Sequence, residues 1–205
     1  MTIDGENLID SILESFSRID YIKPEDIPNI DLYMDQVTTF MESKLRQSTR
    51  NPQDDKILTK TMINNYTKND LLPPPVKKKY SKEHVLLLIF IYYFKGVLSI
   101  NDIQALLQPL TTKYFQGASE LSLESIYNEV FSLEAEEVEM LREDVRRQYA
   151  KSFETFSEAQ EEEKEFLQKF SFICMLSFDV YVKKLLIEKL IDELPKECTD
   201  KKEKS

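Results

Sequence analysis

The sequence predicts a mainly helical, all-α protein. Of its 205 residues, 41% are hydrophobic and 31% are charged, so the chain can bury a core and keep a charged surface. It contains only 3 glycines, whereas β-sandwiches and propellers need many more turn residues. Apolar residues recur every three or four positions along most of the chain, which is the spacing of amphipathic helices.

The residues that most enzymes and metalloproteins use are scarce. The 1 histidine, His84, stands at the start of a predicted helix, where we expect an exposed neutral imidazole. Cys174 lies among apolar residues typical of a core, and its spacing from Cys198 fits no metal motif. The few glycines leave none for a phosphate-binding loop. We therefore expect no catalytic residue, no metal site and no cofactor.

No segment of the sequence is long and apolar enough to span a bilayer. The longest unbroken apolar run, residues 85–94, is well short of the roughly 20 residues that a spanning helix needs. The N-terminal residues Met-Thr-Ile-Asp-Gly-Glu lack the features of a signal peptide. The sequence thus predicts a cytoplasmic protein without a membrane partner.

Periodicity and helix-breaking residues locate the first elements. Apolar spacing predicts a helix around residues 8–16 and a second helix over 30–45. Between them, residues 19–28 contain two prolines and form a connector. Residues 46–52 are polar and end in a proline, so they form a loop.

The segment 59–68 predicts a helix with one polar face. Thr59 is placed to cap it, and Ile63 is placed to pack against the residue before the cap. Asn and Thr are poor helix formers, so a purely structural helix rarely uses this set, although a solvated face is the simpler alternative. Amides and lysines on one face are suited to base edges and phosphates. The polar face consists of Lys60, Thr61, Asn64, Asn65 and Lys68.

Three prolines, residues 73–75, end this helix, and a basic segment follows over 76–80. We expect an extended or turn conformation there, and Lys77, Lys78 and Lys79 supply its positive charge.

Two further helices are marked by caps. Ser81 is placed to cap a helix whose core run is 85–94, and Ser99 with Asp102 caps the next, which Pro109 is expected to end.

Charge is distributed unevenly along the chain. The net charge of −10 argues against a nucleic-acid partner. However, residues 42–95 contain eleven basic and five acidic residues, a net charge of +6, which leaves −16 on the rest. A basic segment in an acidic protein indicates a local anion-binding surface, although a random fluctuation of charge remains an alternative.

The second half of the sequence predicts long acidic helices. Apolar residues step by three or four through a helix over 126–156, and a final helix follows over 166–194. Their apolar faces must pack on each other or form a dimer seam. For the seam we select Val138, Leu141 and Val145, which charged residues flank.

Part of the chain resembles a known family. The order Leu58-Thr-Lys-Thr-Met-Ile-Asn-Asn-Tyr66, then Asp70-Leu71-Leu72-Pro73, then Lys78-Lys79-Tyr80-Ser81, resembles the MerR (mercury-resistance regulator) family over residues 57–110. The stretch 24–110 is more closely similar to a bacterial domain family of unknown function that is assumed to bind DNA. The sequence departs from the regulators at Asn64 and Lys78, where they have arginines, at Asp70, where they have glycine, and in a longer loop over 46–56.

The resemblance implies a winged helix-turn-helix domain with a minimal wing, followed by a C-terminal helical region. The expected domains are an N-terminal helix over 1–23, the MerR-like domain over 24–116, an acidic dimerisation or effector region over 117–195 and a disordered tail over 196–205. Tyr66 and Lys78 would contact phosphates. The full expected set of DNA-binding residues is Lys60, Thr61, Asn64, Asn65, Tyr66, Lys68, Lys77, Lys78 and Lys79.

The sequence-based hypothesis is therefore a transcriptional regulator of the bacterial cytoplasm. It would bind double-stranded DNA through helix 59–68 and wing 76–80 as a homodimer, and it could respond to a small-molecule effector. The alternative is a helical protein-protein interaction module of the same fold that does not bind DNA.

Overall fold

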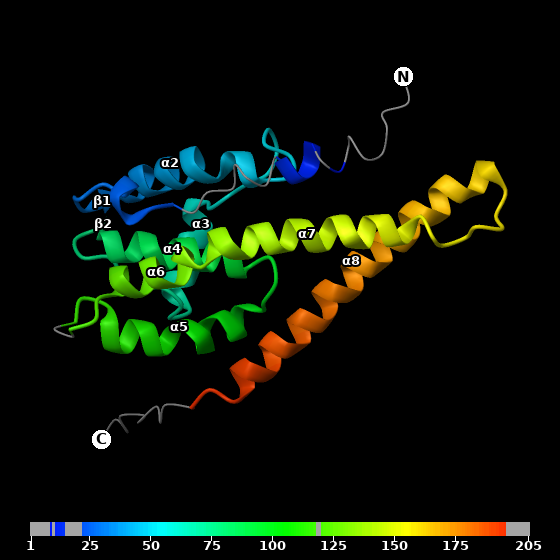
Figure 1. The fold of residues 1–205 in the computed structure, drawn as a ribbon. Coiled ribbons are helices and arrows are strands. Elements are labelled where there is room, and N and C mark those ends of the chain that lie inside the picture. Colours follow the sequence, from blue (N-terminus) through cyan, green and yellow to red (C-terminus); the bar gives the residue numbers. More distant parts are fainter. Residues whose placement is uncertain (1–8, 10, 15–21, 118–119, 196–205) are drawn as a thin grey trace. The chain divides into compact units, whose positions relative to one another are not determined.

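The computed structural model describes residues 9, 11–14, 22–117 and 120–195 (Figure 1). The chain forms two compact units. One comprises residues 1–21 and 128–185, and the other comprises residues 22–127 and 186–205. The second unit contains the whole of the predicted domain 24–116.

The described residues are mainly helical, which confirms the all-α prediction. Strands β1 and β2 form a small antiparallel sheet, in which Leu32 pairs with Tyr80 and Tyr33 with Lys79. Figure 1 shows this sheet at one end of α2 and α4. In order, the elements of the unit 22–127 are η1 (Pro24–Asp26), β1 (Leu32–Tyr33), α2 (Met34–Leu45), η2 (Arg46–Ser48), α3 (Lys60–Lys68), β2 (Lys79–Tyr80), α4 (Lys82–Phe94), α5 (Ile100–Tyr114) and the start of α6 (Leu123–Ser132).

Helix α4 forms the centre of this unit. All side chains from Val85 to Ile91 are buried, the most exposed of them at 4%. Surface helices bury one stripe, so a helix buried on every side must be surrounded by other elements. The surrounding elements also bury their inner side chains, including Val37 and Met41 of α2, Ile63 and Tyr66 of α3, Tyr80 of β2, and Ile103 and Leu107 of α5.

The predicted caps Thr59 and Ser99 are present. The Thr59 hydroxyl accepts a hydrogen bond from the Met62 N–H at 3.2 Å and begins α3. Ser99 and Asp102 form a reciprocal capping box at the start of α5. These bonds satisfy N–H groups that have no partner inside the helix.

Helix α3 ends in a left-handed turn at Asp70, which has φ 55°. The Leu71 N–H donates to the Tyr66 carbonyl at 2.9 Å, and the Asp70 N–H donates to the Thr67 carbonyl at 3.4 Å. This pair of bonds is the Schellman motif, which favours glycine at the left-handed position. Asp70 occupies that position here, at the point where the resembled regulators have glycine.

Two predicted helices have other ends in the structure. The helix expected to start at residue 30 starts at Met34, because Leu32 and Tyr33 pair with β2 as strand β1. Pro109 does not end α5, which continues to Tyr114. A proline removes only one helical hydrogen bond, and the half-buried Leu110 and Tyr114 continue to pack beyond it.

The predicted helix 126–156 is two helices, α6 and α7 (Glu134–Ser152). Leu133, with φ −74° and ψ −17°, acts as the N-cap of α7, so a new helix starts without a proline or glycine to mark it. After α7, successive N–H groups bond only three residues back, and Phe156 is left-handed with φ 54°.

The final helix, α8 (Glu161–Asp192), confirms the predicted helix over 166–194. Within the unit 128–185 it packs on α7: the Phe172 ring meets the Tyr149 ring edge-on at 5.2 Å, and Gln168 Nε2 donates to the Phe153 carbonyl at 2.9 Å. The prediction that Cys174 is a core residue is wrong, since it lies exposed on α8, where Phe172 occupies the side that faces α7. Cys198 and the predicted tail 196–205 lie outside the described residues.

None of the described helices combines the length and the apolarity that crossing a membrane requires.

The prediction that His84 is exposed is wrong. Only 1% of it is exposed, because the first turn of α4 lies against Tyr80 and Phe115, whose rings meet the imidazole edge-on at 5.4 and 4.8 Å. Its Nδ1 accepts a hydrogen bond from the Ser81 N–H at 3.0 Å. Burial lowers the pKa of His84 below its ordinary value, and the carbonyls of Pro74 and Pro73 only partly oppose this.

A lowered pKa means that the folded state disfavours the protonated imidazole. This contribution to stability is therefore complete above the unfolded pKa of about 6.5 and is lost as the pH falls toward the lower folded value. Between about pH 7.5 and about pH 5, we expect the melting temperature of the wild type to fall further than that of His84→Gln. The glutamine keeps an acceptor for the Ser81 N–H but does not titrate. Equal decreases in thermal melts of the two proteins would contradict this role of His84.

Candidate nucleic-acid interface

The polar face predicted for helix α3 is exposed. Lys60, Thr61, Asn64, Asn65 and Lys68 all lie on the surface. On the other side, Ile63 is 0% exposed and Tyr66 is 8% exposed. Since those two residues are anchored in the core around α4, the orientation of the polar face is fixed.

Tyr66 belongs mainly to the packed side of this helix. Burial raises the pKa of its phenol above the ordinary value. Its backbone carbonyl accepts the N–H groups of Leu71 and Leu72. The phosphate contact that the resemblance implies for Tyr66 stays a prediction.

An acidic residue from α2 joins this face. Asp35 forms an ion pair with Lys60, and both side chains are well exposed. No pattern in the sequence indicates this ion pair, because Asp35 lies far from α3 along the chain. Within the part of the chain that the structure describes, Lys68 has no such ion pair.

Residues 76–79 form a tight hairpin. The Val76 N–H donates to the Lys79 carbonyl at 3.1 Å, and the Lys79 N–H donates to the Val76 carbonyl at 2.9 Å. Lys77 and Lys78, the two residues between them, have φ 50° and 65°. Positive φ at both central residues is the feature of a type I′ turn, which normally contains Asn and Gly.

The hairpin is strained where its charge is concentrated. A side chain in the left-handed region costs roughly 1–2 kcal/mol, and the turn carries two of them. Lys77 and Lys78 are exposed at the tip, whereas Lys79 is half-buried, with its ammonium 5.3 Å from the centre of the Tyr33 ring. The three lysines therefore differ in what they can contact, and only the first two extend into solvent.

Both parts of the polar surface border the start of α2. Tyr33 pairs with Lys79 of the hairpin, and two residues later Asp35 pairs with Lys60 of α3. The first turn of α2 thus lies beside both the hairpin and the start of α3. We define the exposed face of α3 together with Lys77 and Lys78 as the basic face.

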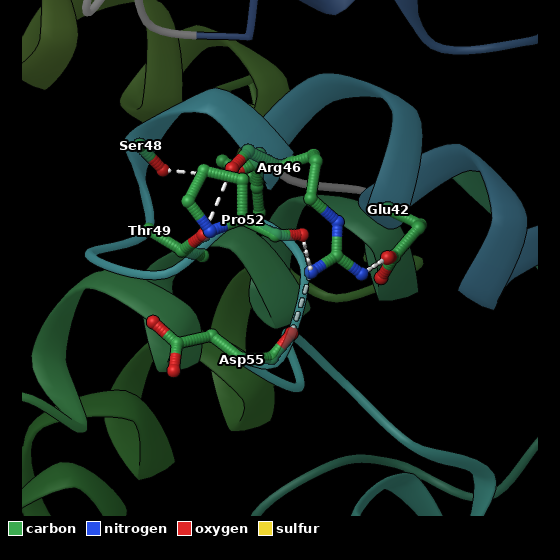
Figure 2. Close-up of polar contacts among 7 residues, drawn as sticks. Glu42, Arg46, Ser48, Thr49, Pro52 and Asp55 are labelled. Atoms are coloured by element: carbon green, nitrogen blue, oxygen red, sulfur yellow. Dashed lines mark hydrogen bonds and ion pairs between the residues drawn. The ribbon is translucent and has the colours of Figure 1, made fainter.

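The long loop between α2 and α3 is held by one arginine (Figure 2). Arg46 Nη1 donates to the carbonyls of Pro52 at 2.7 Å and Asp55 at 2.6 Å, and Nη2 forms an ion pair with Glu42. The Asp55 carboxylate in turn accepts the Asn51 N–H at 2.8 Å. The loop between α2 and α3 is therefore closed by specific bonds.

Several bases of the segment 42–95 have structural partners. Lys44 pairs with Asp26 at 3.2 Å, and Lys82 pairs with Glu124 at 2.9 Å. Lys95 Nζ donates to the Ile57 carbonyl at 2.6 Å, and burial lowers its pKa. The surface charge is consequently smaller than the sequence count of bases indicates.

The predicted dimer residues lie on α7, in the other compact unit. Leu141 is 47% exposed, whereas Val138 and Val145 are half-buried. Their role as a seam stays a prediction.

Within the described residues, no group of three or more His, Cys, Asp and Glu side chains is arranged to hold a metal ion.

The bonds of Arg46 generate a prediction. Arg46→Ala should lower the free energy of unfolding by roughly 1–2 kcal/mol, because it removes charged hydrogen bonds to two carbonyls. Arg46→Lys should not restore it, since one ammonium cannot reproduce the planar fork of a guanidinium. Urea unfolding measures both changes. Arg50→Ala in the same loop is the control, with an expected change within about 0.5 kcal/mol. Equal decreases in the Arg46→Ala and Arg50→Ala variants would show that Arg46 does not hold the loop.

The family assignment follows from the residues that form the unit around α4. A family model with the description Domain of unknown function (DUF1836) matches residues 22–130, more than half of the chain. The match closely follows the compact unit 22–127, whose ends are joined where the Tyr127 hydroxyl donates to the Ile22 carbonyl at 2.7 Å. Searches of curated proteins and of solved structures found no match. The predicted similarity to a domain of unknown function is confirmed, and this chain belongs to the family Domain of unknown function (DUF1836).

Proposed function

We propose that this chain is a sequence-specific, DNA-binding regulator of transcription that acts as a homodimer. It contacts duplex DNA with α3 and with the segment 76–80, which contains the hairpin 76–79. The observation that carries the proposal is the composition of the exposed side of α3: two lysines, two asparagines and a threonine, on a helix with no acidic residue.

The chemistry of this side is suited to base edges. Asparagine can bond adenine through both N6 and N7, and lysine and threonine bond phosphates or guanine. A helix of 9 residues is about 13 Å long, which is comparable with the roughly 12 Å width of the major groove. Asn64 and Asn65 occupy the middle of α3, so they are the residues we assign to the bases.

The hairpin supports the same proposal. Backbone strain that persists in a folded protein tends to occur at functional positions, where surrounding structure enforces it. Here the β1–β2 pairing holds the turn, and the result is two ammonium groups at an exposed tip. Phosphates are the natural partners of such a tip, since phosphate contacts fix the position of a protein on the duplex without reading sequence.

Replacing Lys77 and Lys78 together by alanine should weaken binding to all duplex sequences alike. For each phosphate that the variant no longer neutralises, the slope of log affinity against log salt should flatten by about 0.9. Lys79→Ala should change the slope less, because its ammonium already lies over the Tyr33 ring. Fluorescence anisotropy with random-sequence duplex at several salt concentrations measures both effects.

Lys151→Ala combined with Lys189→Ala is the matched control, since it removes the same charge outside the basic face. A slope unchanged in the hairpin variant would remove the hairpin from the interface. If the wild type does not bind duplex DNA at low salt, the proposal is wrong, and the protein-protein interaction module becomes the better explanation of this fold.

Asn64→Ala and Asn65→Ala should each reduce discrimination at particular base pairs by roughly 1–3 kcal/mol. Binding to random duplex should hardly change, and the melting temperature should stay the same or rise slightly, because both side chains are exposed and alanine is the better helix former. Sites selected from random duplex, then altered one base pair at a time, provide the measurement. Lys68→Ala is the comparison variant, and we expect it to lower the affinity for every sequence by the same amount. Unfolding of either asparagine variant would instead assign that side chain a structural role.

A further inference from the structure

Helix α8 exposes apolar side chains on the side that faces away from α7. Gln168 and Phe172 lie on the side toward α7 and are each 8% exposed. On the other side, every member of an apolar row is more than half exposed. The row, which we call the α8 stripe, consists of Phe166, Phe170, Ile173, Val180 and Tyr181.

The α8 stripe is continuous rather than scattered. Steps of three and four residues connect Phe166, Phe170, Ile173 and Ser177, and Val180 and Tyr181 follow Ser177 by three and four residues. The rings of Phe166 and Phe170 stack with their centres 6.3 Å apart. From Phe166 to Tyr181 the row is about 22 Å long. A surface helix normally places polar residues toward solvent, so a long apolar row there indicates a partner.

The size of the α8 stripe fits a protein interface. An aromatic side chain buries about 150–250 Å², so three aromatic and two aliphatic members supply several hundred Å². A stable interface needs about 800 Å² from each partner. In a two-fold interface the same surface is used by both chains, so each copy contributes the stripe and its charged borders.

The charges along α8 indicate which partner fits. Its first turns contain Glu161, Glu162 and Glu163, and the segment after the α8 stripe contains Lys183 and Lys184. All five are exposed. Within α8, Glu161 pairs with Lys164 at 3.6 Å and Lys183 pairs with Asp179 at 3.0 Å. We base the register on Glu162 and Lys184. A second α8 in antiparallel orientation places the acidic end of one helix beside the basic end of the other. A parallel orientation would place like charges together.

We propose that α8 pairs antiparallel with α8 of a second copy of this chain, with the two-fold axis at Ile173. In this register Ile173 meets its own equivalent, Phe166 lies opposite Val180 of the second copy, and Glu162 lies opposite Lys184 of the second copy. The same axis places Phe170 opposite Leu176 and Tyr181 opposite Glu165 of the second copy. The proposal rests on the homodimer of the proposed function, but it does not depend on DNA binding.

This register moves the dimer seam from α7 to α8. Val138 and Leu141 of α7 line a groove of about 780 Å³ together with Lys183 of α8. These α7 residues thus have α8 as a neighbour within the same unit, and Leu141, at 47%, is less exposed than every member of the α8 stripe. The α8 stripe has no such neighbour on its outer side among the described residues of the unit 128–185.

Cysteine cross-linking tests the orientation. In a background of Cys174→Ser and Cys198→Ser, Ile173→Cys should form a cross-linked dimer with a short bismaleimide. Phe166→Cys alone should not, because its equivalents would be about 21 Å apart along the pair. A mixture of Phe166→Cys and Val180→Cys chains should cross-link. Cross-linking of Phe166→Cys to itself would indicate parallel helices and would overturn the proposal.

Light scattering tests the surface. At micromolar concentration the wild type should have the mass of a dimer, and Phe170→Glu should have the mass of a monomer with its helical circular dichroism retained. Leu141→Glu is the matched control on α7 and should remain a dimer. A monomeric wild type, or a dimer that Leu141→Glu splits and Phe170→Glu does not, would overturn the proposal.

A charge exchange tests the register without changing the α8 stripe. Glu162→Lys should raise the dimer dissociation constant by about three- to tenfold, and adding Lys184→Glu should restore it. These exposed positions leave folding intact, so the result is informative even if Phe170→Glu fails to fold. A dissociation constant that Glu162→Lys leaves unchanged, or that adding Lys184→Glu does not restore, would overturn the register. The Lys77 and Lys78 variants should keep the dimer mass, so failure of DNA binding and failure of this interface are separate results.

Discussion

The burial of α4 on all sides is the constraint on which the rest of the unit 22–127 depends. A helix with no exposed apolar or polar side from Val85 to Ile91 needs neighbours around its whole circumference. Helix α5, strand β2 and Tyr127 of α6 contact α4 directly, and α2 and α3 bury their inner side chains in the same unit. Each of these elements therefore has one side committed to the core, and its other side is what remains for binding. Ile63 and Tyr66 hold one side of α3 in the core, so the polar side of this helix faces solvent.

The same packing explains how a strained hairpin can persist. The turn at Lys77 and Lys78 costs energy locally, but Tyr80 is 2% exposed and anchors the strand that follows it. The pairing of Leu32 with Tyr80 then holds the hairpin to the start of α2. Stability gained in the core thus maintains two lysines in a conformation that they would not adopt alone.

Local signals in the sequence predicted much of this fold, and long-range contacts account for what was missed. Thr59 and the Ser99–Asp102 pair cap their helices as expected, because a cap depends on residues three positions apart. The polar side of α3 was also predicted, since its spacing is local. Strand β1 was missed because two residues are too few to show an alternating pattern, and their pairing with β2 is distant in sequence. The burial of His84 and the bonds of Arg46 were missed for the same reason. Their partners come close only when the chain folds.

The distribution of structural bonds also bears on how an acidic chain could bind DNA. Charges act over about 10 Å at ordinary ionic strength, so the local set of cations matters more than the net charge of −10. The side chains of Arg46, Lys82 and Lys95 form hydrogen bonds within the unit, and Lys60 forms an ion pair with Asp35. Lys68, Lys77 and Lys78 are then the main cations of the basic face. Three phosphate contacts give a salt slope near −2.7, and two copies would double it to about −5.4. One chain therefore makes few phosphate contacts, and pairing two chains doubles their number. In this way the proposed interface on α8 supports the proposed DNA binding by α3.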